Sequence, residues 1–204
     1  MSVTIVEYRG VRGLVYAEVT KDEDGEGNLT FGAVKELAGV ATISKSSESQ
    51  SEAHYYDNIP AVIVNGNGAD TVTLDVSAIP YSVLGDLLGN TYDSDRSMYV
   101  EGERTTKYFA LGYITKDTSG NEIYVWRQKG TFSIPDETNA TEDNGTSANG
   151  QQIVYTGIST VHTFTNNGGK GAKAIYVSEA NTTVSESTFF AAVQTPDTVT
   201  KPSA

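Results

Sequence analysis

Few residues of this chain have the types and spacing that catalysis requires. The chain has 204 residues, with two histidines and no cysteine. His54 and His162 lie in separate segments, and His162 sits between apolar residues in a strand-like pattern, which favours a structural role. A Ser-His-Asp site would be supported by a Gly-x-Ser-x-Gly turn, and the sequence contains none. Without cysteine, the chain can form no thiol nucleophile, disulfide framework or zinc knuckle.

Paired carboxylates are the other residues with catalytic chemistry, since one can act as acid and the other as base. Asp93 with Asp95 and Glu101 with Glu103 are such pairs, but these short polar stretches are typical of a solvated face. The glycine-rich stretches at 66–68 and 168–171 lack the spacing of a phosphate-binding loop. We therefore expect no enzymatic activity and no cofactor. A hydrolase with an unrecognised carboxylate site is a minor alternative.

The densest acidic run, residues 22–27 (DEDGEG), has acids where a calcium loop would have its first ligands. An EF-hand needs a bidentate Glu at position twelve, and Ala33 stands there instead. We therefore expect no metal site. Asp and Gly also favour tight turns, so the run predicts the tip of a hairpin.

The charge balance excludes one class of function. The chain has 26 acidic and 14 basic residues, a net charge of −12 spread along its length. A protein that binds nucleic acid through its phosphates needs a basic face, so we expect no such binding. No leader-like or membrane-spanning stretch is present, which predicts no membrane association and synthesis in the cytoplasm.

The elements that would position these residues are mainly strands. Alternating or continuous runs rich in Val, Ile, Thr and Tyr predict strands over residues 11–20, 59–64, 71–77, 106–116, 121–134, 153–164 and 174–177. Turn clusters stand at 65–68, 144–146 and 166–169. One helix is predicted, with Ser77 as its cap, Pro80 in its first turn and Gly89 at its end. This pattern predicts a mainly β (α+β) fold, a sandwich or barrel flanked by one short helix.

Two segments carry no clear pattern. Residues 44–55 are too polar to pack and long for a connector, so they predict a long loop that is either functional or disordered. The chain from Thr182 onward is rich in Thr, Ser, Val and Pro, which predicts a frayed end or an arm.

The order of these segments resembles the major tail tube proteins of long-tailed, siphovirus-type phages that infect Gram-positive bacteria. The resemblance is carried by residues 10–20 (GVRGLVYAEVT), 55–58 (YYDN), 73–80 (TLDVSAIP), 87–89 (LLG), 108–113 (YFALGY) and 124–135. It covers about residues 10–165 and rests on their succession. The resemblance implies a tail tube β-sandwich domain over 1–165, flanked by a helix and with a long loop that projects from the body. A C-terminal strand and flexible arm over 166–204 would be part of the same domain or an extension of it.

The resemblance implies a structural subunit of the virion tail, assembled in the host bacterial cytoplasm. Such subunits form hexameric rings that stack into a tube, through which double-stranded DNA is ejected without specific binding. The implied partners are further copies of the chain, the tape measure protein, the tail terminator and the baseplate or distal tail proteins.

Two sets of residues are candidates for this role. For ring-to-ring contact we expect the polar loop, with Ser46, Ser47, Glu48, Ser49, Gln50, Ser51 and Glu52. For the lumen, where negative charge would repel phosphates, we expect exposed acids on strands: Asp75, Glu101, Glu103 and Glu122. The alternative is a non-catalytic β-sandwich binding module for carbohydrate or host-surface attachment, which the tyrosine content and Asn/Gly-rich loops would suit.

Overall fold

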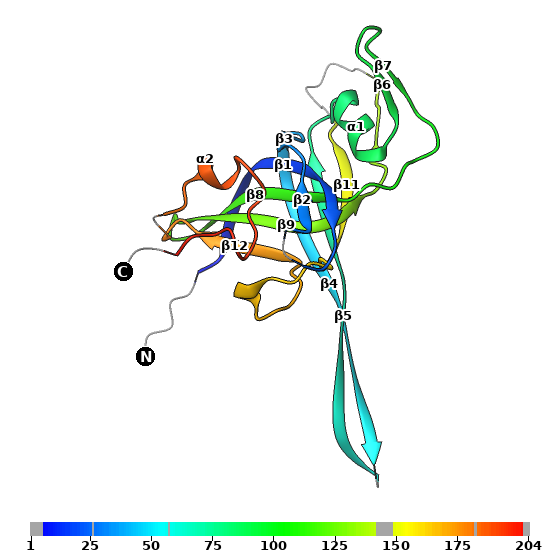
Figure 1. Ribbon diagram of the computed structural model, residues 1–204. Helices are drawn as coiled ribbons and strands as arrows, with labels where there is room; N and C mark the ends of the chain where they lie inside the picture. The colour runs from blue at the N-terminus through cyan, green and yellow to red at the C-terminus, as the bar shows by residue number, and fades with distance from the viewer. Residues whose placement is uncertain (1–5, 26, 57, 142–148, 182, 202–204) are drawn as a thin grey trace.

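The computed structural model describes residues 6–25, 27–56, 58–141, 149–181 and 183–201 (Figure 1). The elements in chain order are β1 (Tyr8–Asp22), β2 (Leu29–Phe31), β3 (Lys35–Glu36), β4 (Val40–Tyr56), β5 (Ile59–Val76), α1 (Tyr81–Leu88), β6 (Thr91–Asp93), β7 (Met98–Val100), β8 (Phe109–Asp117), β9 (Glu122–Phe132), β10 (Asp136–Glu137), β11 (Gln151–Ile158), the 3-10 helix η1 (Thr165–Asn167), β12 (Ala174–Ser178) and α2 (Glu186–Phe189). Neither α-helix of the described chain is long and apolar enough to cross a membrane.

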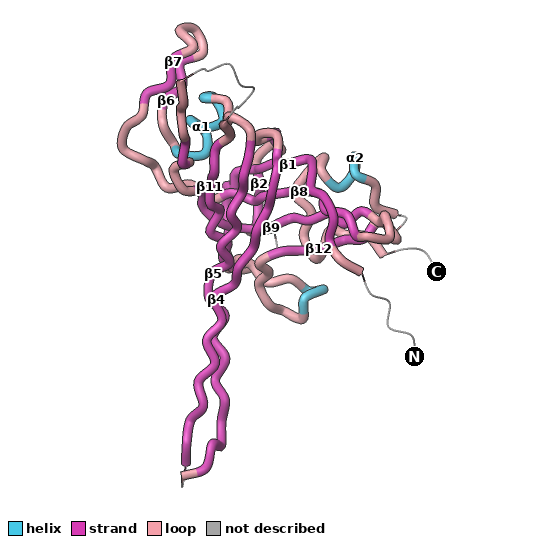
Figure 2. The backbone as a smooth tube through the Cα atoms, turned by 180° about the vertical axis from the view of Figure 1, so that it is seen from behind, coloured by secondary structure: helices cyan, strands magenta, loops and turns pink. Residues whose placement is uncertain are grey.

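Ten strands form one antiparallel sheet that curls into a half-barrel (Figures 1 and 2). Its main order is β2-β1-β8-β9-β11-β5-β4, while β3, β10 and β12 pair with β1, β11 and β9. Strands β6 and β7 form a separate two-stranded sheet next to α1 (Figure 1). The mainly β fold expected from the sequence is confirmed.

The hairpin of β8 and β9 is the clearest agreement between sequence and structure. Lys116 pairs with Glu122, and the turn between the strands is closed by Asp117, whose carboxylate accepts a hydrogen bond from the Asn121 N–H at 2.9 Å. Asp at the start of a turn favours this local bond, which explains why the sequence signal was reliable here.

The main core fills the inside of the half-barrel. Val72, Leu74 and Val76 alternate on β5 and are at most 3% exposed, as the period-two pattern predicts. They pack with side chains from the neighbouring strands and α1, including Leu111 of β8. The Tyr155 hydroxyl, fully buried here, donates to the Phe109 carbonyl at 2.9 Å, which satisfies its polar end.

Helix α1 covers one end of this core with Leu84, Leu87 and Leu88, all buried. The prediction that Ser77 caps it is wrong. Pro80 occupies the cap position, and the Ser77 hydroxyl instead accepts a bond from the Gly39 N–H at 3.1 Å, which ties the helix approach to the start of β4. The helix ends at Gly89 in the left-handed conformation, as expected.

Gly89 gives the first testable prediction. Its φ is 70°, and a β-carbon there would lie 2.7 Å from the Thr105 carbonyl oxygen. We expect Gly89→Ala to lower the free energy of unfolding by at least about 1–2 kcal/mol, the usual cost of a left-handed L-residue. Gly102→Ala is the matched control, because a β-carbon there meets nothing within 4 Å. Urea unfolding of both variants measures the effect, and equal midpoints would contradict it.

The C-terminal segment is the main departure from the sequence-based expectation, since residues 183–201 do not fray. They cross the outer face of β1, β8 and β9, where Phe189 and Val193 are buried against Trp126 in a second core. The Trp126 indole donates to the Phe189 carbonyl at 3.1 Å. Strand β12 pairs with β9 along the same sheet, so the described chain after residue 165 packs on the half-barrel.

Candidate functional site

The most distinctive feature of the molecule is a two-stranded ribbon made by β4 and β5 (Figures 1 and 2). Strand β11 pairs with β5 only between Asp70 and Val76, while β4 and β5 stay paired out to Tyr56 and Ile59. Ser47 pairs with Asp70, so the free part of β4 runs from 48 to 56 and, at about 3.3 Å per residue, extends roughly 30 Å from the half-barrel. We name residues 48–56 and 59–68 the projecting hairpin.

Two sequence-based expectations about this region are wrong. The polar segment expected as a loop does project, but it is part of strand β4. The cluster at 65–68, expected as a turn, lies inside β5, and the chain reverses near Asn58, which has a φ of 64°. Residues 46–52 are exposed on both faces, so they show no buried alternation by which sequence could identify a strand.

The outer part of the projecting hairpin carries exposed apolar side chains. Tyr55, Ile59 and Ile63 are 66%, 64% and 65% exposed. Tyr56, Val62 and Val64 are at least half exposed as well. Exposed apolar side chains that gather on one element in this way mark interaction sites in soluble proteins.

The backbone of the projecting hairpin is equally unpartnered. Within the described residues, β4 is the edge of the sheet, and no third strand joins β5 beyond Asp70. A two-stranded ribbon is marginally stable alone in water, and a long free edge offers hydrogen-bonding groups to another strand. The projecting hairpin therefore has the chemistry of a surface that another protein chain covers.

The expected lumen residue Asp75 lies on a polar sheet face. It points away from the buried row of β5, and its carboxylate accepts a bond from the Gln152 side chain at 2.7 Å. The register places the following residues of β4, β5 and β11 on this outer face: Thr42, Ser44, Ser46, Thr71, Thr73, Asp75, Gln152, Val154 and Thr156. This set, the hydroxyl face, contains no Lys or Arg.

The other expected lumen acids lie elsewhere. Glu101 and Glu103 are exposed in the connection between β7 and β8. Glu122 starts β9 and pairs with Arg12 at 2.8 Å, and the same guanidinium also binds Glu186. The structure therefore does not bring the four acids together on one surface.

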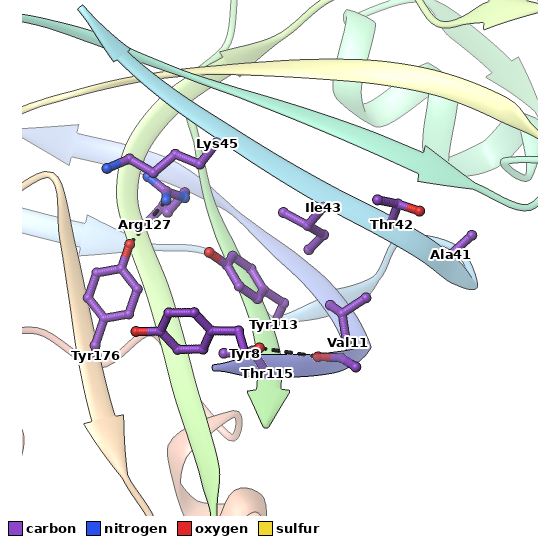
Figure 3. Close-up of a pocket in the computed structure, with 11 residues that line it drawn as sticks. Tyr8, Val11, Ala41, Thr42, Ile43, Lys45, Tyr113, Thr115, Arg127 and Tyr176 are labelled. Atoms are coloured by element: carbon purple, nitrogen blue, oxygen red, sulfur yellow. Dashed lines mark hydrogen bonds between the residues drawn. The ribbon is translucent and has the colours of Figure 1, made fainter. Parts of the chain in front are cut away.

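A pocket of about 450 Å³ opens where the curled sheet brings β1 and β4 opposite each other (Figure 3). The rings of Tyr8, Tyr113 and Tyr176 lie along it, and the basic groups of Lys45 and Arg127 lie together at one end. Arg127 is 1% exposed, although it is charged.

Arg127 is held by a buried ion-pair cluster around Asp70, which is 5% exposed. The Asp70 carboxylate lies 3.1 Å from Arg127, 3.3 Å from Lys173 and 3.6 Å from Lys45. Burial acts to raise the pKa of Asp70, but hydrogen bonds from Ser47 and Lys173 and the nearby lysine charges outweigh it and hold the pKa below its usual value. No sequence motif brings these four residues together. The only signal of the cluster was an arginine within the apolar run of β9.

Asp22, at the end of β1, forms a comparable group of ion-pair and hydrogen-bond contacts. Its carboxylate binds Lys129 at 2.6 Å and accepts the N–H groups of Val161 and His162. Burial acts to raise the pKa of Asp22, and these bonds lower it overall. They also draw the chain away after β11 ends, so His162 does not lie in a strand, contrary to expectation.

These two carboxylates predict how stability depends on pH. Because their folded pKa values lie below the unfolded value of about 4, the stabilisation is complete above that value and is lost as the pH falls through the folded pKa. We expect the free energy of unfolding to be steady from pH 7 to about 5 and to fall below about 4. In Asp22→Asn, the free energy of unfolding should fall less steeply as the pH is lowered. Urea titrations at several pH values test it, and an unchanged slope would contradict it.

The remaining candidates for chemistry are dispersed. His54 lies on the projecting hairpin, whereas the His162 ring packs edge-on against Phe164 with centroids 4.9 Å apart. Asp93 accepts N–H bonds from Asp95 and Arg96 within a turn, so the Asp93/Asp95 pair is tied up locally. In the part of the chain that the structure describes, no group of three or more acids or histidines is placed to hold a metal ion.

Comparison with known proteins adds no relative: no family model matches the chain, and no curated protein matches it significantly.

Proposed function

We propose that this protein is a structural subunit of a phage tail tube. In this role it assembles into stacked hexameric rings that form a conduit for double-stranded DNA during ejection into the host. The observation that carries the proposal is the projecting hairpin, together with the resemblance of residues 10–165 to major tail tube proteins.

The projecting hairpin supports self-assembly because it leaves apolar side chains and strand edges uncovered. Residues 48–56 and 59–68 make one long ribbon, so a neighbouring subunit could cover both at once. Fully burying one large apolar side chain contributes about 1.5–3 kcal/mol, so several at the tip can supply a stable contact. Ser46 to Glu52, the candidate ring-stacking residues, then form the polar base of this contact.

The hydroxyl face supports the conduit part of the proposal. Each Lys or Arg contact with a phosphate adds salt-dependent affinity for DNA, which would hold the cargo back. The hydroxyl face has none, and Asp75 adds negative charge. We propose that this face, with Asp75, borders the lumen. Glu101, Glu103 and Glu122 remain weaker candidates because they lie away from it.

The assembled protein would belong to the virion tail, put together in the cytoplasm of the bacterial host. Its partners would be further copies of itself, the tape measure protein, the tail terminator and the baseplate or distal tail proteins. DNA would pass without specific binding, and the proposed role involves no catalysis, no cofactor and no membrane.

Self-association of the purified chain tests the proposal. We expect sedimentation velocity to show larger species as concentration rises, and negative-stain images to show rings or tubes, with or without a tail initiator complex. A chain that remains monomeric under all these conditions would contradict the proposal. Binding of such a monomer to a glycan array would instead favour the attachment module.

A further inference from the structure

The cluster at Asp70 holds more positive charge than its carboxylate can neutralise. Arg127, Lys173 and Lys45 all approach this one group, at 3.1, 3.3 and 3.6 Å. Among the described residues, these three cations form no other ion pair. A local excess of cations stands out in a chain with a net charge of −12.

The three cations differ in how many hydrogen-bond and ion-pair partners they have. Lys173 bonds both to Asp70 and to the Gly68 carbonyl. Arg127 bonds to Asp70 and to the Tyr176 hydroxyl, but its buried Nε has no partner. Lys45 has only the long contact to Asp70, and its side chain is 40% exposed. The accessible donors therefore belong to Lys45, while the buried Arg127 adds positive charge beside it.

Both of these cations line the pocket between β1 and β4 that is flanked by Tyr8, Tyr113 and Tyr176 (Figure 3). Its volume of about 450 Å³ lies within the range of small-ligand sites. The Tyr8 and Tyr176 side chains are 75% and 52% exposed, so the mouth is open to solvent. Aromatic rings along the sides and two cations at one end suit a small group that is negative at one end and apolar beyond it.

We propose that this pocket is a binding site for a carboxylate, held by Lys45 and Arg127 and flanked by Tyr8, Tyr113 and Tyr176. The Lys45 ammonium supplies accessible N–H donors and Arg127 supplies a second positive charge, which together suit the oxygens of a carboxylate. The carboxylate belongs either to a small free acid or to an acidic side chain of a second copy of this chain.

Benzoate is the probe, and benzamide, which has nearly the same shape but no charge, is its control. We expect calorimetric or NMR titration of the monomeric chain to show benzoate binding about tenfold or more tighter than benzamide, the size of one charge-assisted bond. Lys45→Gln should weaken benzoate binding about tenfold, and Lys45→Arg should largely retain it. Lys35→Gln, an exposed lysine outside the pocket, should change nothing. Equal binding of the two probes, or benzoate binding unaffected by Lys45→Gln, would overturn the proposal.

A second measurement identifies the source of the carboxylate. If it comes from a second copy, Lys45→Gln raises the dissociation constant of self-association about tenfold, and benzoate competes with assembly. If it comes from a free acid, self-association is the same with and without the substitution. The benzoate titration uses unassembled protein, so its result stands whether or not the chain forms tubes.

Discussion

Shortening the projecting hairpin should abolish assembly while leaving the half-barrel folded. The variant lacks residues 50–66 and joins Ser49 to Asn67, which pair directly, through an Asn-Gly turn. It removes the exposed apolar tip and most of the free edge. Because several buried side chains of about 1.5–3 kcal/mol each would be lost from the contact, we expect the concentration needed for assembly to rise more than roughly 100-fold.

The half-barrel should not depend on the removed part. No described strand other than β4 pairs with β5 beyond Asp70, so shortening removes no contact of the main core. The free energy of urea unfolding, followed by circular dichroism, should therefore match that of the unshortened chain within about 1 kcal/mol. Sedimentation velocity and negative-stain images measure the assembly. Rings or tubes formed by the shortened variant at the normal concentration would show that the projecting hairpin is not the contact.

A single-residue pair provides a finer control for the same surface. Ile63 is 65% exposed on the projecting hairpin, and Ile134 is 53% exposed elsewhere. Ile63→Asp should impair assembly strongly, and Ile134→Asp should not. Equal effects would mean that exposed apolar residues act through general solubility instead of a specific contact.

Phe189→Ala should cause the largest loss of stability of any change in the C-terminal segment. The side chain is 1% exposed and packs against Tyr124 and Phe190, over the buried Trp126. Truncating a buried phenylalanine costs about 3–5 kcal/mol, because transfer energy is lost and a cavity remains. For a chain of this size, we expect a fall in Tm of about 6–20 °C.

Calorimetry or urea unfolding measures this loss. Ile134→Ala is a suitable control, since Ile134 is 53% exposed and an exposed substitution changes stability by about 0.5 kcal/mol or less. If Phe189→Ala behaved like the control, the C-terminal segment would be a dispensable arm, as its composition first suggested.

Sequence patterns predicted this fold well wherever one face of an element is buried. Val72, Leu74 and Val76 alternate because one side of β5 faces the core, and Gly89 ends α1 because only a left-handed residue fits there. The second core had a visible signal in the apolar run at 189–193, but the polar residues around it obscured that signal.

The projecting hairpin shows where such patterns fail. Its strands have no buried face, so hydrophobic alternation is absent. Gly68 gave a turn signal, yet it lies in a bulge of β5 opposite Glu48, where a β-carbon would come within 2.6 Å of the Glu48 β-carbon. The glycine permits close approach of two strands and does not reverse the chain.

The pocket could not be predicted from the sequence, for a different reason. The carboxylate of Asp70 is surrounded by cations from other strands and connections: Lys45, Arg127 and Lys173. Only the strand order brings these residues together. Buried charges of this kind are paired in the folded state, so their presence in a strand indicates a partner without naming it.

A three-dimensional reconstruction of the assembled particles tests the central claim most directly. We expect hexameric rings around an open channel, with each projecting hairpin packed against a neighbouring subunit and the hydroxyl face, including Asp75, turned to the channel. A solid fibre, hairpins left free in solvent, or a channel bordered by lysine and arginine with the hydroxyl face on the outer wall would contradict the account.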